Sequence, residues 1–309
     1  VIKPSQVTPE NCTEFAHVVE ESGLPAGVIN IVTGRGSVIG NEMAGSPKVD
    51  IVSVTGSVSA GESIMKAAAN NITKVSLELG GKAPAIVFPD ADLEASAQWI
   101  LDSRIGNNGQ ICNNAERVYV HKDIKKEFTD ILLRKFEAVK VGDPCKDHTV
   151  DMGPLVEKRA LESVEAKVEN AIKQGAKVLC GGHRVGDKGY FYAATLLDNC
   201  TQDMDIIHEE TFGPVLPIVE FEDTDQVIAW ANDVEYGLAS SVFTKDIDTA
   251  AKVTRGLEFG ETYINREHFE AMQGFHAGVK KSGIGGADGK HGVEEYLVTH
   301  VTYLDTHYE

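Results

Sequence analysis

The sequence predicts a doubly wound α/β fold. Two early runs, "GVINIVTG" (27–34) and "KVDIVSVTG" (48–56), are short, rich in valine and isoleucine, and end in glycine. Such runs are typical of buried parallel strands. Segments with helical spacing of apolar residues alternate with runs of this kind along the chain. This alternation is typical of a parallel sheet that is covered by helices on both faces.

In the first half of the chain, a helix is expected at 58–70 because the start signal "TGS" precedes it. The run "KVSLELGGKAPAIVF" (74–88) predicts a strand, a break at Gly80–Gly81 and a second strand. The segment "DADLEASAQWILDSR" then predicts a helix, since an acidic N-terminal cluster precedes apolar residues at helical spacing. The Gly-Gly pair is the best candidate for a domain crossing.

The same alternation continues in the second half. "ERVYVHKD" predicts a strand, and helices are expected at 123–139 and 157–174. Three further strands are expected at "VLPIVEF", "LASSVFT" and "ETYIN". The tail from about residue 284 is rich in glycine and ends in the strand-like run "YLVTHVTYL".

Composition excludes several classes of partner. The net charge is −18, which argues against nucleic acid and against anionic membrane surfaces. No apolar run approaches the length of a membrane-spanning helix. None of the five cysteines lies within four residues of another, so no zinc or redox pair is expected. Their odd number and wide spacing indicate a reducing compartment, and we expect a cytoplasmic protein.

Cys112 stands in an unusual context for a cysteine, in "NNGQICNNAERV" (107–118). Unoxidised cysteines are usually small buried hydrophobic residues, but this one is surrounded by residues that form loops and hydrogen bonds. Two interpretations are open, a reactive thiolate or an unreactive thiol in a turn. The local stretch by itself favours the unreactive thiol.

Four other motifs each have a functional and an ordinary interpretation. "TGSVSAG" (55–61) follows a strand and opens a helix, so it suits either a phosphate site or a serine N-cap. Glu78 in "LELGGK" is either a base at a strand end or a solvated glutamate. "HEETFGPV" (208–215) is either a ligand loop or a loop with a salt-bridged acid. The run 264–283, which contains Glu270 and His276, either lines a pocket or forms a surface loop.

Taken together, these motifs resemble the aldehyde dehydrogenase superfamily. The pattern consists of "LELGGKAPAIV", then "NNGQICNN", then "EETFGPV", with "VIKPS" and "TGSVSAG" before it and "KSGIGGADG" after it. The resemblance extends from residue 1 to the C-terminus, and its glutamate and cysteine motifs are specific. Within the superfamily the chain is most similar to lactaldehyde and glycolaldehyde dehydrogenases, on the runs "TGSVSAGE", "CNNAERVYV" and "FEAMQGFHAG".

The resemblance implies a Rossmann-like cofactor domain, present in part, and an α/β catalytic domain. We expect residues 1–80 to be the C-terminal part of the dinucleotide-binding domain, 81–283 the catalytic domain, and 284–309 a return and oligomerisation segment. Family members have a long stretch before the strand that carries Lys3, including an asparagine of the oxyanion hole. We therefore expect an N-terminally truncated chain that is a poor enzyme by itself.

The resemblance also implies the catalytic residues. Cys112 is the nucleophile, whose thiolate attacks the aldehyde to give a thiohemiacetal and, after hydride transfer to nicotinamide, a thioester. Glu78 is the base for the thiol, for the hydrolytic water or for both. Because the nucleophile must be accessible, the polar turn around Cys112 suits this role, and the interpretation of Cys112 as a thiolate becomes the favoured one.

The expected cofactor is NAD, with NADP also possible, and no catalytic metal is implied. Family members often have glutamate where this sequence has Gln6, and glutamine would not repel a 2′-phosphate, for which Arg35 is a possible partner. The cofactor-binding residues implied by the resemblance are Lys3, Ser5, Gln6, Gly56, Ser57, Gly61, Glu210 and Phe212.

We expect a small hydroxyaldehyde as substrate, lactaldehyde or glycolaldehyde, bound by Asn113, Glu270 and His276. An amide, a carboxylate and an imidazole suit a hydroxyl group beside the carbonyl. A homo-oligomer, dimer or tetramer, is expected, without nucleic-acid or membrane partners. Two alternatives compete with this enzyme. One is a non-catalytic binding or structural module, and the other is a cysteine hydrolase, disfavoured because the sequence places no histidine near Cys112.

Overall fold

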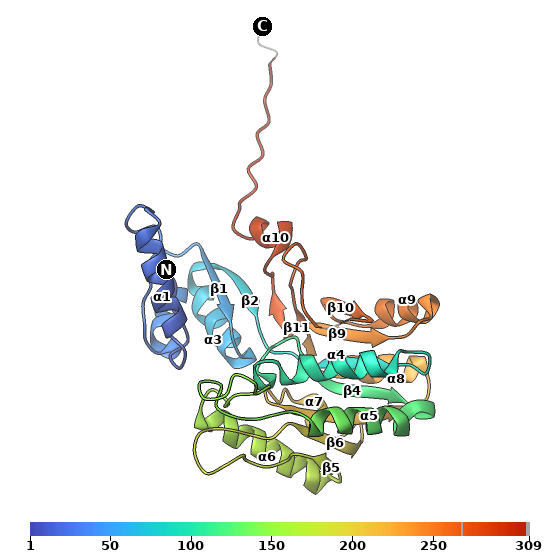
Figure 1. Cartoon of the computed structure of the whole chain (residues 1–309). Coiled ribbons are helices and arrows are strands. Elements are labelled where there is room, and N and C mark those ends of the chain that lie inside the picture. The colour runs from blue at the N-terminus through green and yellow to red at the C-terminus, as the bar shows by residue number, and fades with distance from the viewer. Residues whose placement is uncertain (267, 307–309) are drawn as a thin grey trace.

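The computed structural model describes residues 1–266 and 268–306, and it contains two sheets of very different size (Figure 1). The small sheet has the order β1-β2-β12, formed by Ile51–Thr55, Lys74–Glu78 and Gly283–Ile284. β1 and β2 are parallel, and β12 returns antiparallel to β2. Helix α3 (Val58–Ala68) connects β1 to β2, as the parallel pairing requires.

The large sheet has seven strands in the order β10-β9-β3-β4-β7-β6-β5. All neighbours are parallel except β5, which runs antiparallel to β6 at the edge. The strands are β3 (Ala83–Val87), β4 (Ala115–His121), β5 (Lys177–Cys180), β6 (Thr195–Cys200), β7 (Val215–Phe221), β9 (Ala239–Phe243) and β10 (Glu261–Ile264). A separate two-stranded antiparallel sheet pairs β8 (Tyr236–Gly237) with β11 (Val279–Lys280).

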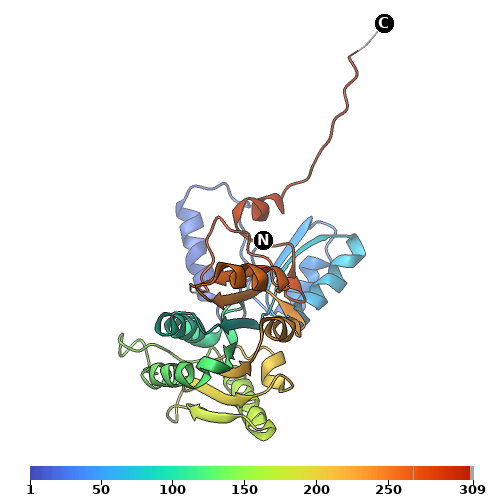
Figure 2. The ribbon, with the colours of Figure 1, turned by 90° about the vertical axis from the view of Figure 1, so that its right-hand side faces the viewer.

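Helices cover both faces of the large sheet, which confirms the doubly wound fold (Figure 2). Alternate strand residues pack on opposite sides, so Val118 and Val120 of β4 contact one core and Tyr119 contacts the other. One core includes α4 (Leu93–Ile105) and α5 (Lys125–Glu137). The other includes α6 (Lys158–Gln174), α7 (Asp205–His208), α8 (Thr224–Asn232) and α9 (Ile247–Gly256).

The short passage from β2 to β3 through Gly80–Gly81 lies between the two sheets. The carboxyl end of β2 therefore faces the amino end of β3. We keep this passage as the proposed domain boundary. On the N-terminal side of this passage the chain also forms α1 (Glu10–Glu21), a π-helical turn (Gly36–Gly40) and α2 (Asn41–Ala44).

Two strands expected from the sequence are absent from the described residues. In 27–34 only a single bridge forms, between Ile31 and Ile2, and Val28 is exposed. The run 296–304 follows α10 (Gly289–Glu294) and extends away from the body of the chain without strand pairing (Figure 1). Valine and isoleucine favour a strand only where a neighbouring strand can pair with it. Residues 307–309 of the expected oligomerisation segment lie outside the described part.

Across the part of the chain that the structure describes, no helix has both the length and the apolar character needed to span a membrane.

Candidate active site

Three of the predicted site residues, Glu78, Cys112 and Glu210, meet where the two sheets face each other. Glu78 is the last residue of β2, while Cys112 precedes β4 and Glu210 precedes β7. β3, β4 and β7 are adjacent and parallel, so their amino ends lie at one edge of the large sheet. Glu78 thus has the strand-end position that the sequence indicates. Cys112 lies at the opposite kind of end, the amino end of a strand.

The two glycines between the sheets allow this close meeting. A β-carbon on Gly80 would lie 2.6 Å from Glu210 Oε2, and one on Gly81 would lie 2.3 Å from the Cys112 carbonyl oxygen. The Gly81 N–H also donates to Glu210 Oε1 at 2.9 Å. Ser282, from the "KSG" motif, is fully buried and donates to the Gly80 carbonyl at 2.7 Å. Glycine is therefore required here for close backbone approach.

The asparagines before Cys112 shape its loop. Asn107 and Asn108 have φ of 46° and 59°, in the left-handed region that asparagine tolerates better than most residues. Asn108 Nδ2 donates to the Pro154 carbonyl at 2.7 Å, which anchors the turn to a distant segment. Arg104, buried on α4, donates to the carbonyls of Gly109 and Ala115 at 2.7 and 2.9 Å. The loop is thus held on both sides of the half-buried Cys112.

Glu78 is a buried carboxylate without hydrogen bonds. Its side chain is 9% exposed, and within the described residues neither carboxylate oxygen has a hydrogen-bond partner. Burial raises the pKa of Glu78 to about 7, while the nearby charge of His276 opposes this shift. His276 Nε2 lies 3.6 Å from Glu78 Oε2. A carboxylate with this pKa can accept and release a proton near neutral pH.

His276 lies near both Glu78 and Cys112. Its Nδ1 lies 2.9 Å from Glu261 Oε1. The nearby Cys112 side chain and the hydrogen bond to Glu261 raise the pKa of His276 to about 11. The sequence argument that no histidine stands near Cys112 is therefore wrong. The separation of 164 positions along the chain concealed this proximity, since the loop after β10 brings His276 back.

Asn113 and Glu270 form a second polar pair beside Cys112. Asn113 is 3% exposed, and its Nδ2 donates to Glu270 Oε2 at 2.8 Å. Tyr263 lies near Asn113, and its hydroxyl donates to Glu261 Oε2 at 2.6 Å. The three residues expected to bind substrate, Asn113, Glu270 and His276, therefore all have polar partners, and none of the three is exposed.

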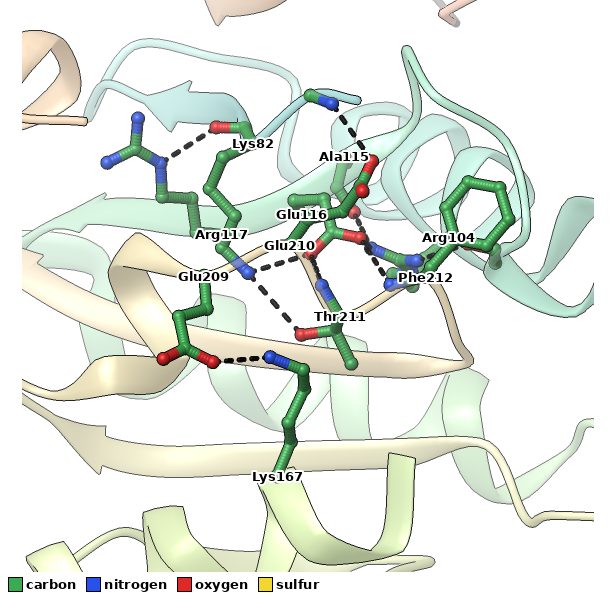
Figure 3. Close-up of polar contacts among 12 residues, drawn as sticks. Lys82, Arg104, Ala115, Glu116, Arg117, Lys167, Glu209, Glu210, Thr211 and Phe212 are labelled. Atoms are coloured by element: carbon green, nitrogen blue, oxygen red, sulfur yellow. Dashed lines mark hydrogen bonds and ion pairs between the residues drawn. The ribbon is translucent and has the colours of Figure 1, made fainter. Parts of the chain in front are cut away.

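A buried ion network joins the cysteine loop to the loop of Glu210 (Figure 3). Glu116 is 1% exposed and contacts Lys82 Nζ at 2.7 Å and Arg104 NH1 at 2.9 Å. It also accepts the backbone N–H groups of Thr211 and Phe212, at 3.0 and 3.2 Å. Burial opposes ionisation, but Arg104 and Lys82 outweigh it and hold the pKa of Glu116 down at about 2. The charged network fixes the segment that follows Glu210.

Glu210 itself lies at the surface of this network. Burial, with the charge of Glu116, raises the pKa of Glu210 to about 7. Phe212, two residues on, is 42% exposed and has a φ of 49°. Its ring therefore stands clear of the core, although its backbone is fixed by Glu116.

The predicted phosphate-binding turn lies at the carboxyl end of β1. Ser57 is the N-cap of α3, and its Oγ accepts from the Ala60 N–H at 3.3 Å. Gly56 and Ser57 are exposed, so the helix start is open to a ligand. Gly61 is buried, and a β-carbon there would lie 2.6 Å from Leu79 Cδ1. Gly61 thus lets α3 pack on the chain just after β2.

Lys3, Ser5 and Gln6 lie on the segment that leads into α1. Lys3 is half-buried, donates to the Pro4 carbonyl, and lies beside Gly36 of the π-helical turn. Ser5, Gln6 and the adjoining Arg35 are exposed. Ser5 and Gln6, which the sequence predicts to bind an adenosine ribose together with Lys3, are therefore accessible, and they lie outside the ion network.

The remaining cysteines differ from Cys112 in their surroundings. Cys200 is buried, and burial raises its pKa to about 12. Burial also raises the pKa of the Cys180 thiol. Cys145 is exposed on a loop. Among the residues described, no cluster of three or more histidine, cysteine, aspartate or glutamate side chains could hold a metal ion.

Sequence reasoning missed Glu261 and the Lys82–Arg104–Glu116 network. The signal for Glu261 was weak but present, since Glu261 and Tyr263 alternate on one face of the expected strand "ETYIN". For Glu116 the signal was a charged pair inside the otherwise apolar strand "AERVYV". Charges buried in a strand need partners, and these partners come from segments far away in the sequence.

Comparison with known proteins gives one family. The aldehyde dehydrogenase family model matches residues 1–302. The lactaldehyde dehydrogenase of Escherichia coli (strain K12) is 58% identical over 99% of this chain and 64% of its own length. A crystal structure of lactaldehyde dehydrogenase from Escherichia coli superimposes with a TM-score of 0.97, at 59% identity over 98% of this chain and 64% of that one.

A structure of 3,6-anhydro-L-galactose dehydrogenase in complex with NAP has a TM-score of 0.94 and 49% identity, over 96% of this chain and 63% of that one. The chain thus spans a little under two thirds of the length of these relatives. Since the family model matches nearly every residue, and the Glu78, Cys112 and Glu210 motifs meet in one place, this chain belongs to the aldehyde dehydrogenase family.

Proposed function

We propose that this chain carries the catalytic site of an NAD(P)-dependent dehydrogenase that oxidises a small hydroxyaldehyde to its acid. One observation carries the proposal. Cys112, Glu78 and Glu210 converge on the Gly80–Gly81 passage, and His276 Nε2 lies 3.6 Å from Glu78 Oε2. A nucleophile, a base near neutral pKa and a cofactor-side carboxylate in one place are what aldehyde oxidation through a thioester requires.

Cys112 begins the reaction by attacking the aldehyde carbon as a thiolate, which places a negative charge on the carbonyl oxygen. We expect the Cys112 backbone N–H to help stabilise this oxyanion. A bound nicotinamide cofactor supplies the acceptor for the hydride. Cys112 then holds the acyl group as a thioester, and Glu78 takes the proton of the attacking water. The acid is released and Cys112 is again free.

The chain's own residues fit such a cofactor. The exposed start of α3 at Gly56–Ser57 suits a pyrophosphate, because its N–H groups and helix dipole favour an anion. Glu210 has its second carboxylate oxygen available for ribose hydroxyls, and Phe212 presents an exposed ring beside it. Lys3, Ser5 and Gln6 lie at the expected adenosine end. Gly61 contributes through the packing of α3.

We propose NAD as the preferred cofactor, with NADP tolerated. Gln6 carries no charge that would repel a 2′-phosphate, and the exposed Arg35 adjoins Gly36, against which Lys3 packs. The solved relative in complex with NAP supports this tolerance.

The hydroxyl of the substrate is proposed to contact the polar wall of Asn113, Glu270 and His276. Such a wall, left without a hydrogen-bonding substrate, would disfavour a plain aliphatic aldehyde. The similarity to a lactaldehyde dehydrogenase supports lactaldehyde as the first substrate to test, with glycolaldehyde second. A cytoplasmic homo-oligomer remains our proposal, and the exposed apolar residues Val298 and Tyr303 support self-association.

A second candidate function follows from the position of His276 near Cys112. A cysteine, a histidine near it and a glutamate bound to that histidine also form the arrangement of cysteine hydrolases. Hydrolysis of an activated ester without cofactor, at a rate that exceeds aldehyde oxidation, would favour this candidate. Absence of both activities would favour the non-catalytic module.

The test of the main proposal is NADH formation at 340 nm with lactaldehyde and NAD. We expect turnover that Cys112→Ser abolishes, because serine is a far weaker nucleophile at its ordinary pKa. The control variant is Cys145→Ser, which changes an exposed cysteine outside the site. Equal turnover by the Cys112→Ser variant would overturn the assignment.

A further inference from the structure

Two loops that carry proposed site residues touch each other along their backbones. The cysteine loop (residues 106–114) leads into β4, and the carboxylate loop (residues 209–214), which contains Glu210, leads into β7. A β-carbon on Gly109 would lie 2.3 Å from the Gly213 carbonyl oxygen, so only glycine fits where the loops meet. The position of Glu210 relative to Cys112 therefore depends on how these two loops are held together.

Glu116 of β4 holds the carboxylate loop by its backbone. Its Oε2 accepts the Thr211 N–H at 3.0 Å, and its Oε1 accepts the Phe212 N–H at 3.2 Å (Figure 3). Thr211 and Phe212 are the two residues that directly follow Glu210. The Glu116 side chain is 1% exposed, so it is enclosed by protein and out of reach of a ligand at the surface. Glu116 thus fixes the backbone from which the Glu210 side chain extends.

Arg104 and Lys82 connect Glu116 to the other parts of the site. Arg104 NH1 lies 2.9 Å from Glu116 Oε1, and its NH2 donates to the Gly109 carbonyl of the cysteine loop at 2.7 Å. Lys82 Nζ lies 2.7 Å from Glu116 Oε2. The backbone of Lys82 directly follows Gly81, whose N–H donates to Glu210 Oε1 at 2.9 Å. One network therefore holds the cysteine loop, the carboxylate loop and the donor that binds the Glu210 side chain.

Stability alone does not account for a network of this kind. Buried ion pairs can often be replaced by apolar residues of similar volume without loss of stability, although removing a single partner is costly. The contacts that leave the three charged residues go to backbone or hydroxyl groups of the two loops: the carbonyls of Gly109 and Ala115, the Thr211 hydroxyl and the N–H groups of Thr211 and Phe212. The network is thus built around the geometry of the site.

We propose that Glu116 is a positioning residue for cofactor binding, which holds the Glu210 carboxylate where it can bind the ribose next to nicotinamide. Glu116 acts through the N–H groups of Thr211 and Phe212 and does not touch the cofactor. The proposal deepens the proposed function and rests on Glu210 as a cofactor-binding residue. Its consequence is selective, because the network supports the nicotinamide half of the site and leaves the adenosine half at Lys3 untouched.

NADH and ADP separate these two halves without any turnover. ADP has the adenosine ribose and two phosphates but no nicotinamide ribose, so it offers Glu210 nothing to bind. The dissociation constants of both ligands are measured by isothermal titration calorimetry with the 309-residue chain and with Glu116→Gln. Glutamine cannot accept from both N–H groups, because one end of its amide is a donor. We expect the Kd for NADH to rise about tenfold, the equivalent of one hydrogen bond, and the Kd for ADP to stay within about twofold.

Glu116→Asp is the second variant, because Glu116→Gln is expected to lower the stability of the chain. Aspartate keeps the negative charge beside Lys82 and Arg104, but its side chain is shorter by one methylene and reaches the carboxylate loop less well. We expect the same selective loss of NADH affinity, to a smaller extent. General loss of structure would instead weaken NADH and ADP alike.

Asp90→Asn is the matched control. Asp90 also accepts two consecutive backbone N–H groups, those of Lys245 and Asp246, at 2.7 and 2.9 Å. These contacts lie beyond the carboxyl ends of β3 and β9, whereas the site lies at the amino ends of the strands. The Asp90→Asn variant should bind NADH and ADP as the parent does.

A second measurement tests whether Glu116 acts through Glu210. In a Glu210→Ala background, addition of Glu116→Gln should change the Kd for NADH by no more than about twofold, because residues that act on one interaction are not additive.

Equal weakening of NADH and ADP in Glu116→Gln would overturn the proposal, as would unchanged NADH binding in both Glu116 variants. So would a further tenfold loss in the Glu210→Ala background, since Glu116 would then act by another route. Failure of the proposed function looks different: the parent chain itself would bind neither NADH nor ADP, and the role of Glu116 would fall with it.

Discussion

The carbonyl oxygen of Cys112 lies so close to Gly81 that a β-carbon on Gly81 would be 2.3 Å from it. At the adjacent Gly80 a β-carbon would instead meet the carboxylate of Glu210, at 2.6 Å. The obstacle at Gly81 is backbone, which cannot move without the cysteine loop. The obstacle at Gly80 is the end of a side chain, which can rotate.

The alanine variants of Gly80 and Gly81 should therefore affect different kinetic parameters. We expect Gly81→Ala to displace Cys112 and to reduce kcat about a hundredfold or more, as a misplacement of about 1 Å does elsewhere. Gly80→Ala should mainly raise the KM for NAD, since it displaces Glu210. Steady-state kinetics of both variants check this. Equal effects on kcat and on the KM for NAD in the two variants would contradict the geometry.

Glu78→Gln should remove a base whose pKa is about 7. Burial raises that pKa, so the carboxyl group is protonated below pH 7 and acts as a base only above it. The parent should therefore lose turnover as the pH falls from 8 to 6. The kcat of Glu78→Gln should be lower by about 10²-fold or more, and it should no longer fall between pH 8 and pH 6. Rapid-mixing experiments should show an NADH burst in the variant. If kcat of the variant still falls near pH 7, the titrating group is not Glu78.

Glu116→Gln should destabilise the chain strongly, since it leaves Lys82 and Arg104 buried with one charge fewer to pair with. Breaking a buried ion pair from one side typically costs about 3–5 kcal/mol of unfolding free energy. Urea denaturation measures the change. Glu94→Gln, which removes an exposed ion pair with Arg134, is the control and should leave the midpoint unchanged. Equal midpoints for Glu116→Gln and the parent would show that the network is not stabilising.

Much of the fold was predictable because the responsible signals are local. One continuous run of residues around Glu78 predicts a strand, a glycine pair and a second strand. Asp92 is the N-cap of α4 and accepts from the Ala95 N–H, as the acidic start of that segment suggests. The strand predicted at 27–34 was wrong for a physical reason. Strand-forming residues still need a neighbouring strand, and within the described residues Ile31 forms an isolated bridge with Ile2.

The site was predictable only in part. Cys112 and Glu78 were identified by motifs, and His276 and Glu270 by the polarity of their loop. Their mutual contacts were not, because those contacts join residues far apart in the chain and depend on the order of strands in the large sheet. Glu261 was missed for the same reason, since its carboxylate contacts His276 only because the loop after β10 brings His276 back to that strand.

Asn113→Ala should lower discrimination between substrates more than it lowers activity in general. Its Nδ2 donates to Glu270 at 2.8 Å within the proposed hydroxyl-binding wall. Loss of one hydrogen bond of ~1–1.5 kcal/mol corresponds to about tenfold in kcat/KM for lactaldehyde. Propanal, which lacks the hydroxyl group, serves as the control substrate and should be affected less. An equal loss of kcat/KM for both aldehydes would show that Asn113 does not contact the substrate hydroxyl group.

The most direct measurement is the ratio of kcat/KM for lactaldehyde to that for propanal in the parent protein with NAD. The two substrates differ by one hydroxyl group, so the ratio reports how the wall of Asn113, Glu270 and His276 acts in the transition state. We expect lactaldehyde to be preferred about tenfold or more, with both activities lost in Cys112→Ser. A ratio near one, or turnover that survives in Cys112→Ser, would contradict the account of a hydroxyaldehyde dehydrogenase built on Cys112.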